Sequence, residues 1–242
     1  MCRTHRIVGS RKNKDRWPMI KKIEILDIQL DNYTVSEAML QVEVYLNNTV
    51  MNTIEDISME MLVLAGEDEV LKECIEHLDL AIVSEKEILA AAGVNSVQRI
   101  RETVDKQFFA EFMKRIIRNH KTVYLFGQTR QQVAQLTAFL KESYEQLPIA
   151  GSFSMEDCVG DFDGAVNEIN IVSPDVIFSV LPTPQQEYFL MENKDKMNAK
   201  IWYGLGSGYE KAHGVSYIRR QAKKLLHRGR LRSMLSRYNQ SK

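Results

Sequence analysis

The sequence predicts an α/β protein in which a mostly parallel sheet is covered by helices on both faces. Two observations favour this fold class. Short apolar runs alternate with helical periodicities along the chain, which is typical of parallel strands joined by crossover helices. The 242 residues, 44% of them hydrophobic, also suffice to bury a large core. We expect a flexible basic segment at 1–21, one α/β domain at 22–214 and a basic helical appendage at 215–242.

The strands are predicted from short runs of apolar and β-branched residues. Several of these runs lead into a glycine, at Gly127, Gly151 and Gly204, where the backbone can turn sharply. The expected strands lie at 22–26, 52–57, 80–83, 122–126, 149–151, 175–181 and 199–203.

The helices between these strands are predicted from periodicity and capping residues. Thr34 and Glu37 form a capping box, and the helix after them carries Ala38, Met39, Val42, Tyr45 and Leu46 on one face. The segments 84–87 and 154–157 resemble two further capping boxes. A stripe of apolar residues predicts one long helix: Val104, Phe108, Phe109, Phe112, Ile116 and Ile117. Shorter helices are expected at 61–64, after Gly66, after Arg130 and at 184–192.

Composition excludes several classes of protein. The net charge is zero, so nothing draws the whole chain to nucleic acid. Cys2, Cys74 and Cys158 are too far apart to form a metal-binding pair or a disulfide framework, which favours a reducing cytosol. The sequence contains no apolar run of the roughly 18 residues that a membrane span needs, and its basic start lacks the apolar stretch of a signal peptide.

Basic residues gather at the C-terminus, where no acid follows Glu210. They include Arg219, Arg220, Lys223, Lys224, Arg228, Arg230, Arg232 and Arg237. Two interpretations stay open. The segment is a solvated, partly disordered tail, or it is a basic helix that binds phosphate or a membrane surface.

A ligand site is expected where the parallel strands end, because ligands of such sheets bind outside the carboxyl ends of the strands. The segments there are 84–87, 127–130, 182–187 and 204–208. Gly127 precedes a helix whose free amides could bind an anion. The glycines of 204–208 permit close approach of a ligand, although their spacing does not match a dinucleotide-binding motif.

Individual side chains in these segments allow more than one role. Glu85 could be a general base, or it could simply stabilise the first turn of a helix. Gln186 could contact a sugar or a base, and Glu187 could simply interact favourably with the dipole at the start of its helix. The five histidines show no metal-ligand spacing, and the Asp161–Asp163 motif does not follow an apolar strand. We therefore expect no metal and no cofactor.

Taken together, several of these segments resemble the WecG/TagA/CpsF glycosyltransferase family over about residues 22–214. The segments that carry the resemblance are 31–38, 59–65, Arg99–Ile100, 123–127, 173–187 and 204–214. The most specific is the Pro-x-Gln-Glu element at Pro184–Glu187. The resemblance implies a Rossmann-like domain at the cytoplasmic face of the cell membrane. It also implies transfer of an N-acetylmannosamine-type sugar from a UDP-sugar to a polyprenyl-diphosphate-linked acceptor.

The resemblance also implies residue roles. Glu85 takes the place of the catalytic aspartate, and Arg99 that of an arginine that contacts the diphosphate. Asp56 and Ser58 lie in the substrate loop. Gln186 and Glu187 lie at the sugar, with Gly127, Gly204 and Gly206 along the nucleotide-sugar pocket. The basic appendage, with Arg220, Arg228 and Arg232, is expected at the lipid diphosphate or the membrane.

Departures from the family pattern keep a second function open. Asp56-Ile57-Ser58 replaces a Thr-x-Asn loop, Glu85-Lys86 replaces Asp-Gly, and Pro182 replaces a glycine. All of these changes affect the chemistry and spare the scaffold. The alternative is an inactive member of the family that binds a nucleotide sugar, a lipid phosphate or a partner protein. The sequence leaves the oligomeric state open, a homo-oligomer included.

Overall fold

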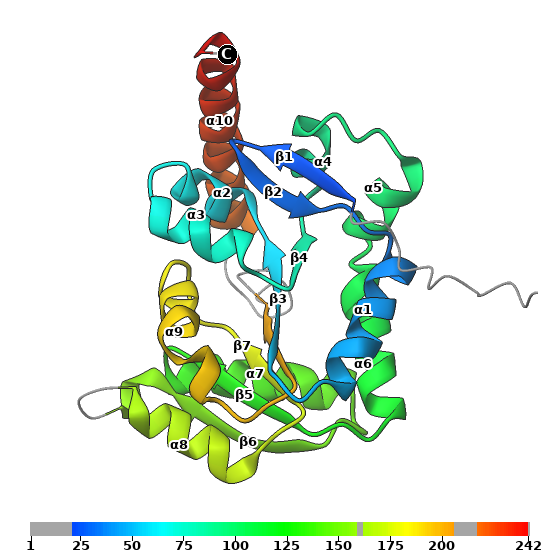
Figure 1. Cartoon of the computed structure of the whole chain (residues 1–242), viewed down its shortest axis with the longest axis vertical. Helices are drawn as coiled ribbons and strands as arrows, with labels where there is room; N and C mark the ends of the chain where they lie inside the picture. Colours follow the sequence, from blue (N-terminus) through cyan, green and yellow to red (C-terminus); the bar gives the residue numbers. More distant parts are fainter. Residues whose placement is uncertain (1–20, 159–161, 206–216, 242) are drawn as a thin grey trace, which may run out of the picture.

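The structure, a computed structural model, describes residues 21–158, 162–205 and 217–241, and the side chains of the last helix from 226 to 240 (Figure 1). The main sheet has six parallel strands in the order β4-β3-β8-β7-β5-β6, and β1 pairs with β2 as a separate antiparallel hairpin. The strands are β1 Lys22–Ile25, β2 Ile28–Asp31, β3 Asn52–Ile57, β4 Leu80–Val83, β5 Val123–Gly127, β6 Ile149–Ser154, β7 Val176–Ser179 and β8 Ile201–Gly204. The parallel sheet confirms the α/β, Rossmann-like prediction.

Helices connect the strands and cover the sheet. They are α1 Val35–Asn47, α2 Met59–Ala65, α3 Glu69–Glu76, α4 Lys86–Ala91, α5 Val97–Val104, α6 Gln107–Arg118, α7 Arg130–Ser143, α8 Asp163–Val172, α9 Gln185–Asn193 and α10 Tyr217–Ser241. Two short 3-10 turns occur at Met155–Asp157 and Lys194–Lys196. In α1 the five residues predicted to be buried are the ones that are buried, and both hydrogen bonds of the capping box are present.

Three apolar clusters hold these layers together. On the front face of the sheet, α1, α6 and α7 pack against the strands. On the back face, α8 and α9 pack around Phe126 and Trp202. Figure 1 shows α1 and α6 on one side of the sheet and α8 and α9 on the other. The third cluster joins the β1–β2 hairpin to α2, α3, α4 and α10 beyond the ends of β3 and β4.

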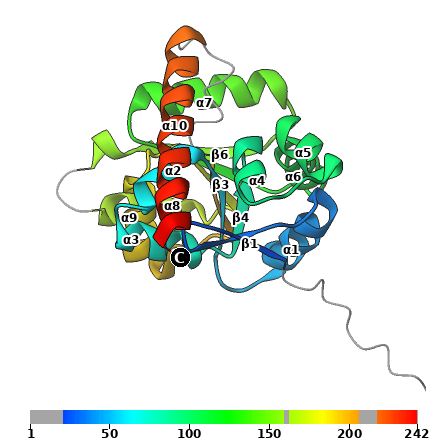
Figure 2. The same ribbon diagram turned by 90° about the horizontal axis from the view of Figure 1, so that it is seen from above.

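The C-terminal appendage is a helix that packs on the body of the protein. Residues of α10 contact α2, and the two helices lie together in both views (Figures 1 and 2). Leu231 is buried in the third cluster, and Met234 and Leu235 pack against it. For these residues the prediction of a basic helix holds and that of a disordered tail does not.

Three local predictions were wrong. Ser84 does not cap α4: its hydroxyl donates to the Ile57 carbonyl of the neighbouring strand, and Glu85 takes the N-cap position without a side-chain cap bond. The long helix is broken, because Lys106 adopts a left-handed conformation (φ 54°) between α5 and α6 and leaves Val104 exposed. Ser154 donates to the Asp157 carboxylate instead of capping a helix.

Candidate active site

The ends of β3 and β4 bring three predicted site residues to one edge of the sheet: Asp56, Ser58 and Glu85. Ser58 follows β3 and caps α2, where its hydroxyl accepts a hydrogen bond from the Met61 amide at 3.2 Å. Glu85 follows β4, and its Oε1 accepts from the Met59 amide in the same helical turn at 3.2 Å. A carboxylate at a helix N-terminus is stabilised there by the unpaired amides. The hydrogen bond from Met59 positions the Glu85 carboxylate, and because the residue is only half-buried, part of it faces solvent.

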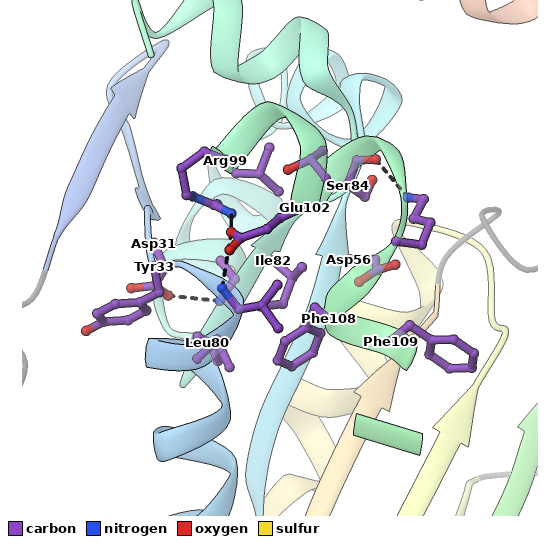
Figure 3. Close-up of a pocket in the computed structure, with 16 residues that line it drawn as sticks. Asp31, Tyr33, Asp56, Leu80, Ile82, Ser84, Arg99, Glu102, Phe108 and Phe109 are labelled. Atoms are coloured by element: carbon purple, nitrogen blue, oxygen red, sulfur yellow. Dashed lines mark hydrogen bonds and ion pairs between the residues drawn. The ribbon is translucent and has the colours of Figure 1, made fainter. Parts of the chain in front are cut away.

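A cleft opens on the front face beside this edge. Asp56, Ser84, Arg99 and Lys106 line it together with Phe108 and Phe109. Figure 3 shows Asp56 beside the two phenylalanines, at the opposite end of the cleft from Tyr33. The enclosed part of the cleft is only about 30 Å³, which has room for no more than a few water molecules. A larger ligand would therefore lie across the mouth of this cleft and would reach into it with single groups.

Asp56 and Lys106 supply opposite charges to this cleft. The Tyr203 hydroxyl donates to Asp56 Oδ1 at 3.0 Å. Burial and the charge of Asp56 raise the pKa of Tyr203 well above its ordinary value, so Tyr203 stays a neutral donor. The Lys106 ammonium donates to the Ser84 carbonyl at 2.7 Å, just before Glu85. The left-handed turn at Lys106 thus carries a cation that is held by the carbonyl of the residue before the predicted base.

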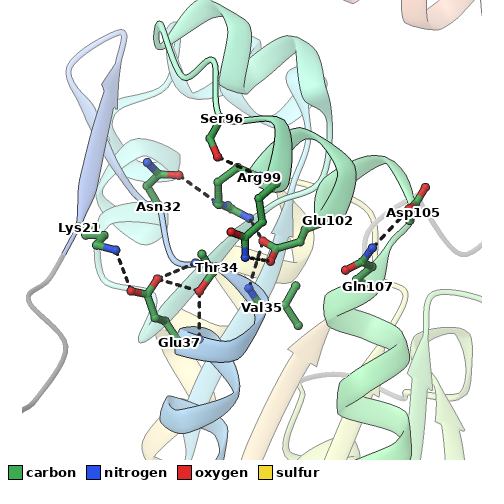
Figure 4. A network of polar contacts seen from close by, with 11 residues as sticks. Lys21, Asn32, Thr34, Val35, Glu37, Ser96, Arg99, Glu102, Asp105 and Gln107 are labelled. Carbon is green, nitrogen blue, oxygen red and sulfur yellow. Dashed lines mark hydrogen bonds and ion pairs between the residues drawn. The ribbon is translucent and has the colours of Figure 1, made fainter.

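Arg99 lines the same cleft but is held by its neighbours (Figure 4). Its Nε donates to Asn32 Oδ1 and its guanidinium to Glu102 Oε2, both at 3.1 Å. Glu102 is 7% exposed and also accepts from Gln98 and from the Val35 amide. This network fixes the start of α1 against α5. A diphosphate would have to share Arg99 with a carboxylate that is already bound to it.

Gln186 and Glu187 lie behind β3, on the face opposite the cleft. Glu55 and Asp56 are consecutive residues of a strand, so their side chains point to opposite faces. Gln186 donates through Nε2 to Glu55, and Thr183 donates to Glu187 Oε1 at 3.0 Å. Gln186 and Glu187 are 1% and 2% exposed. Gly204 makes room for this pair, because a Cβ there would lie 2.3 Å from Gln186 Nε2.

The carboxyl groups of Glu55 and Glu187 are both buried and influence each other. Burial and the charge of Glu187 raise the pKa of Glu55 well above its usual range, and burial also raises that of Glu187. Within the described residues no donor reaches Glu55 Oε2 or Glu187 Oε2. The raised pKa values favour a protonated form of the pair, in which one carboxyl can donate to the other.

The anion site predicted after Gly127 is already filled by the protein. Gly127 is buried between Val133 and Val180. The Gln128 and Thr129 amides donate to Gln132 Oε1, and the Arg130 amide donates to Glu156 at 2.7 Å. A phosphate at the start of α7 would have to displace these acceptors.

The remaining predicted residues are placed only in part. Gly206 and the side chain of Arg220 lie outside the described residues. On α10, Arg228 is half-buried and Arg232 is exposed. Among the residues that the structure describes, no group of three or more His, Cys, Asp or Glu side chains could hold a metal ion. The same part of the chain contains no helix with the length and apolarity that a membrane crossing requires.

Sequence reasoning missed Lys106, Tyr203 and Glu55. A lysine inside a predicted helical stripe gives no signal until the helix is seen to break there. Tyr203 reads as one more apolar strand residue. Glu55 did carry a signal, since a glutamate between Ile54 and Asp56 interrupts a strand that is otherwise central and buried.

Comparisons with known proteins identify the family of the chain. A family model described as the glycosyl transferase WecG/TagA/CpsF family matches residues 23–214. Curated relatives from Staphylococcus aureus strains NCTC 8325 and COL are each named N-acetylglucosaminyldiphosphoundecaprenol N-acetyl-beta-D-mannosaminyltransferase. Each is 21% identical to this chain over 201 residues, which cover 78% of this chain and 74% of the relative.

Proposed function

The chain belongs to the WecG/TagA/CpsF family of glycosyltransferases, and from that premise we propose that it transfers an N-acetylmannosamine-type sugar. The donor is a UDP-sugar, and the acceptor is a sugar linked to a polyprenyl diphosphate. The family match over 23–214 and the activity named for the Staphylococcus relatives support this choice of substrates. The observation that carries it is local: Asp56, Ser58 and Glu85 lie at the ends of two adjacent strands, where the Lys106 ammonium binds the Ser84 carbonyl.

Each of these groups has a role in the proposed reaction. Glu85 takes the proton from the acceptor hydroxyl, whose oxygen then bonds to the anomeric carbon of the donor sugar. The bond from that carbon to the UDP oxygen breaks, and UDP leaves with the bonding electrons. Lys106 and Arg99 stabilise the negative charge that develops on the diphosphate. Asp56, held by Tyr203, accepts hydrogen bonds from sugar hydroxyls at the mouth of the cleft.

Gln186, Glu187 and Gly204 have an indirect role in this proposal. Their side chains are buried, and Gln186 ties α9 to β3 across Gly204. This contact sets the position of the residues at the end of β3, which include Asp56. Gln186 is therefore proposed as a positioning residue, and direct contact with the sugar stays a prediction.

A second candidate function is a binding module without turnover. The contacts that favour it are the prior engagement of Glu85 by the Met59 amide and of Arg99 by Glu102. Turnover requires both groups to be shared with a substrate. A binding module requires only the cleft and its charges.

One experiment separates the two functions. The protein is incubated with UDP-N-acetylmannosamine and a short-chain polyprenyl-diphosphate-linked N-acetylglucosamine, and UDP release and the new disaccharide are measured. Formation of both products supports the transferase. UDP that protects against thermal unfolding without any turnover supports the binding module. If neither product formation nor protection occurs with this or other UDP-sugars, both proposals fail.

The acceptor is a lipid, so we also propose that α10 lies against the membrane surface. Arg230 and Arg232 are exposed on this helix, whereas Leu231 between them is buried. Truncation after Gly214 would remove Leu231 from the core, so it cannot test the charge alone. The double variant Arg230→Glu, Arg232→Glu leaves the packing intact and should lose binding to anionic liposomes. Unchanged liposome binding, with binding of the wild type established, would refute this role.

A further inference from the structure

A second cavity lies behind the sheet, between α3 and α9. The two helices contact each other, and the Tyr188 hydroxyl of α9 donates to Asp68 at the start of α3. Figure 1 shows α3 and α9 facing each other, away from α1 and α5 on the cleft side. The cavity measures about 380 Å³, within the range of small-molecule sites. It does not share a lining residue with the cleft beside Asp56.

Glu187 gives this cavity a buried carboxyl group. Its side chain lines the cavity although only 2% of the residue is exposed. In the described part of the chain no donor reaches Glu187 Oε2, and no Lys, Arg or His side chain forms an ion pair with Glu187 or Glu55. A buried carboxyl oxygen without a donor is unfavourable, and a cationic donor would satisfy it.

The two basic residues on the cavity wall do not fill this role. His77 is exposed, and its Nδ1 lies 2.8 Å from the Glu73 carbonyl oxygen. Lys194 lines the cavity, but its ammonium is 2.9 Å from Asp79 Oδ2 and is paired there. Asp79 is itself fixed, because it accepts from the amide and the hydroxyl of Thr53 at 2.8 and 3.0 Å. A cationic donor for Glu187 would therefore have to come from a ligand.

The rest of the lining defines the shape of the missing group. Leu78, Leu190 and Met191 form apolar walls above Glu187. Glu73 and Asp195 also line the cavity, and both are exposed, so they form an acidic rim. The order from inside to outside is thus acid, aliphatic wall, acid. That order matches a short alkyl chain with a positive charge at each end.

We propose that this cavity binds an aliphatic diamine, with one ammonium on Glu187 and the other at the rim. The inner ammonium donates to the buried carboxyl pair, the methylene chain lies on Leu190 and Met191, and the outer ammonium meets Glu73 or Asp195. This site is separate from the glycosyltransferase cleft and does not depend on the proposed transfer reaction.

Cys74 offers a direct readout, because it lines the cavity and its Sγ lies 4.0 Å from Met191 Sδ. The full-length protein is alkylated with iodoacetamide, with and without 1,5-diaminopentane, and each cysteine peptide is quantified by mass spectrometry. Cys158 lies outside the cavity and serves as the internal control. The diamine should slow alkylation at Cys74 and leave Cys158 unchanged. Equal protection by 1,5-pentanediol, or no protection at Cys74, would overturn the proposal.

Variants then assign the binding to Glu187 and to the cavity. Glu187→Gln should weaken diamine affinity about tenfold, because it removes a charge-assisted hydrogen bond. The control Glu192→Gln changes an exposed glutamate on the same helix, and it should bind as the wild type does. Met191→Trp replaces an exposed side chain of the wall and should abolish binding by filling the space. Should Glu187→Gln not fold, Met191→Trp decides: unchanged calorimetric affinity in that variant refutes the site.

Discussion

Glu55 and Asp56 are neighbours on β3, yet they face opposite environments. Asp56 points to the front cleft, is half-exposed and pairs with Tyr203. Glu55 points behind the sheet and is 1% exposed, and burial together with the charge of Glu187 raises its pKa. Because side chains alternate between the two faces of a strand, a substrate can reach Asp56 but not Glu55. Glu55 can affect the cleft only through the packing of the interior. We expect changes on the front face to affect turnover, and changes on the back face to affect stability first.

The largest effect is expected at Glu85, which follows β4 at the sheet edge beside the front cleft. Glu85→Gln keeps an oxygen that can accept from the Met59 amide, so the N-terminus of α2 stays satisfied. The variant loses the base, and kcat should fall about 10²- to 10⁴-fold, with a small change in Tm. Steady-state kinetics and thermal melting measure the two quantities. Glu142→Gln, an exposed change on α7, is the control. Turnover that survives Glu85→Gln would remove Glu85 as the base.

The next effect lies on the back face, at Gly204. A Cβ in Gly204→Ala would lie 2.3 Å from Gln186 Nε2 and 2.9 Å from its Cδ, so Gln186 would have to leave Glu55. We expect a loss of about 2–4 kcal/mol in the free energy of unfolding, from overpacking and a broken buried hydrogen bond. Urea denaturation measures it. Gly164→Ala is the matched control, because its Cβ would meet nothing within 4 Å. Equal effects of the two substitutions would contradict the proposed close packing.

Glu55→Gln tests the raised pKa of Glu55 on the same face. The raised pKa means that folded Glu55 keeps a proton that the unfolded chain loses near pH 4.3. Its contribution to stability is therefore full below that pH and is lost as the pH rises through the folded pKa. Glutamine has no such proton to lose, so the variant should be more stable than the wild type near pH 8.

Urea denaturation between pH 4.5 and 8 checks this prediction. The stability of the wild type should decline with pH more steeply than that of Glu55→Gln. Part of the slope remains in the variant, because Glu187 is also buried and titrates. Parallel stability curves for the two proteins would show that Glu55 does not hold the extra proton.

The front and back faces also differ in how far the sequence predicts them. Elements that depend on local signals were predicted, such as the capping box of Thr34 and the buried stripe of α1. Contacts between distant segments were not. Glu55 and Gln186 are 131 residues apart, and nothing near either residue indicates that they meet. Ser84 was assigned a local cap because its real partner, the Ile57 carbonyl, belongs to another strand. The resemblance supplied site residues, but only the fold could separate them into two faces.

The smallest predicted effect is that of Lys106, and it returns to the front cleft. Lys106→Met keeps the aliphatic stem and removes the ammonium that donates to the Ser84 carbonyl. Loss of that hydrogen bond should cost about 0.5–1.5 kcal/mol of stability. Loss of a charge near the donor diphosphate should raise KM for the UDP-sugar about tenfold. Lys114→Met, an exposed lysine of α6, is the control for both measurements. A Lys106→Met protein that loses stability but keeps its KM would limit Lys106 to holding the end of β4. Among the described residues that line the cleft, Arg99 would then be the remaining cation.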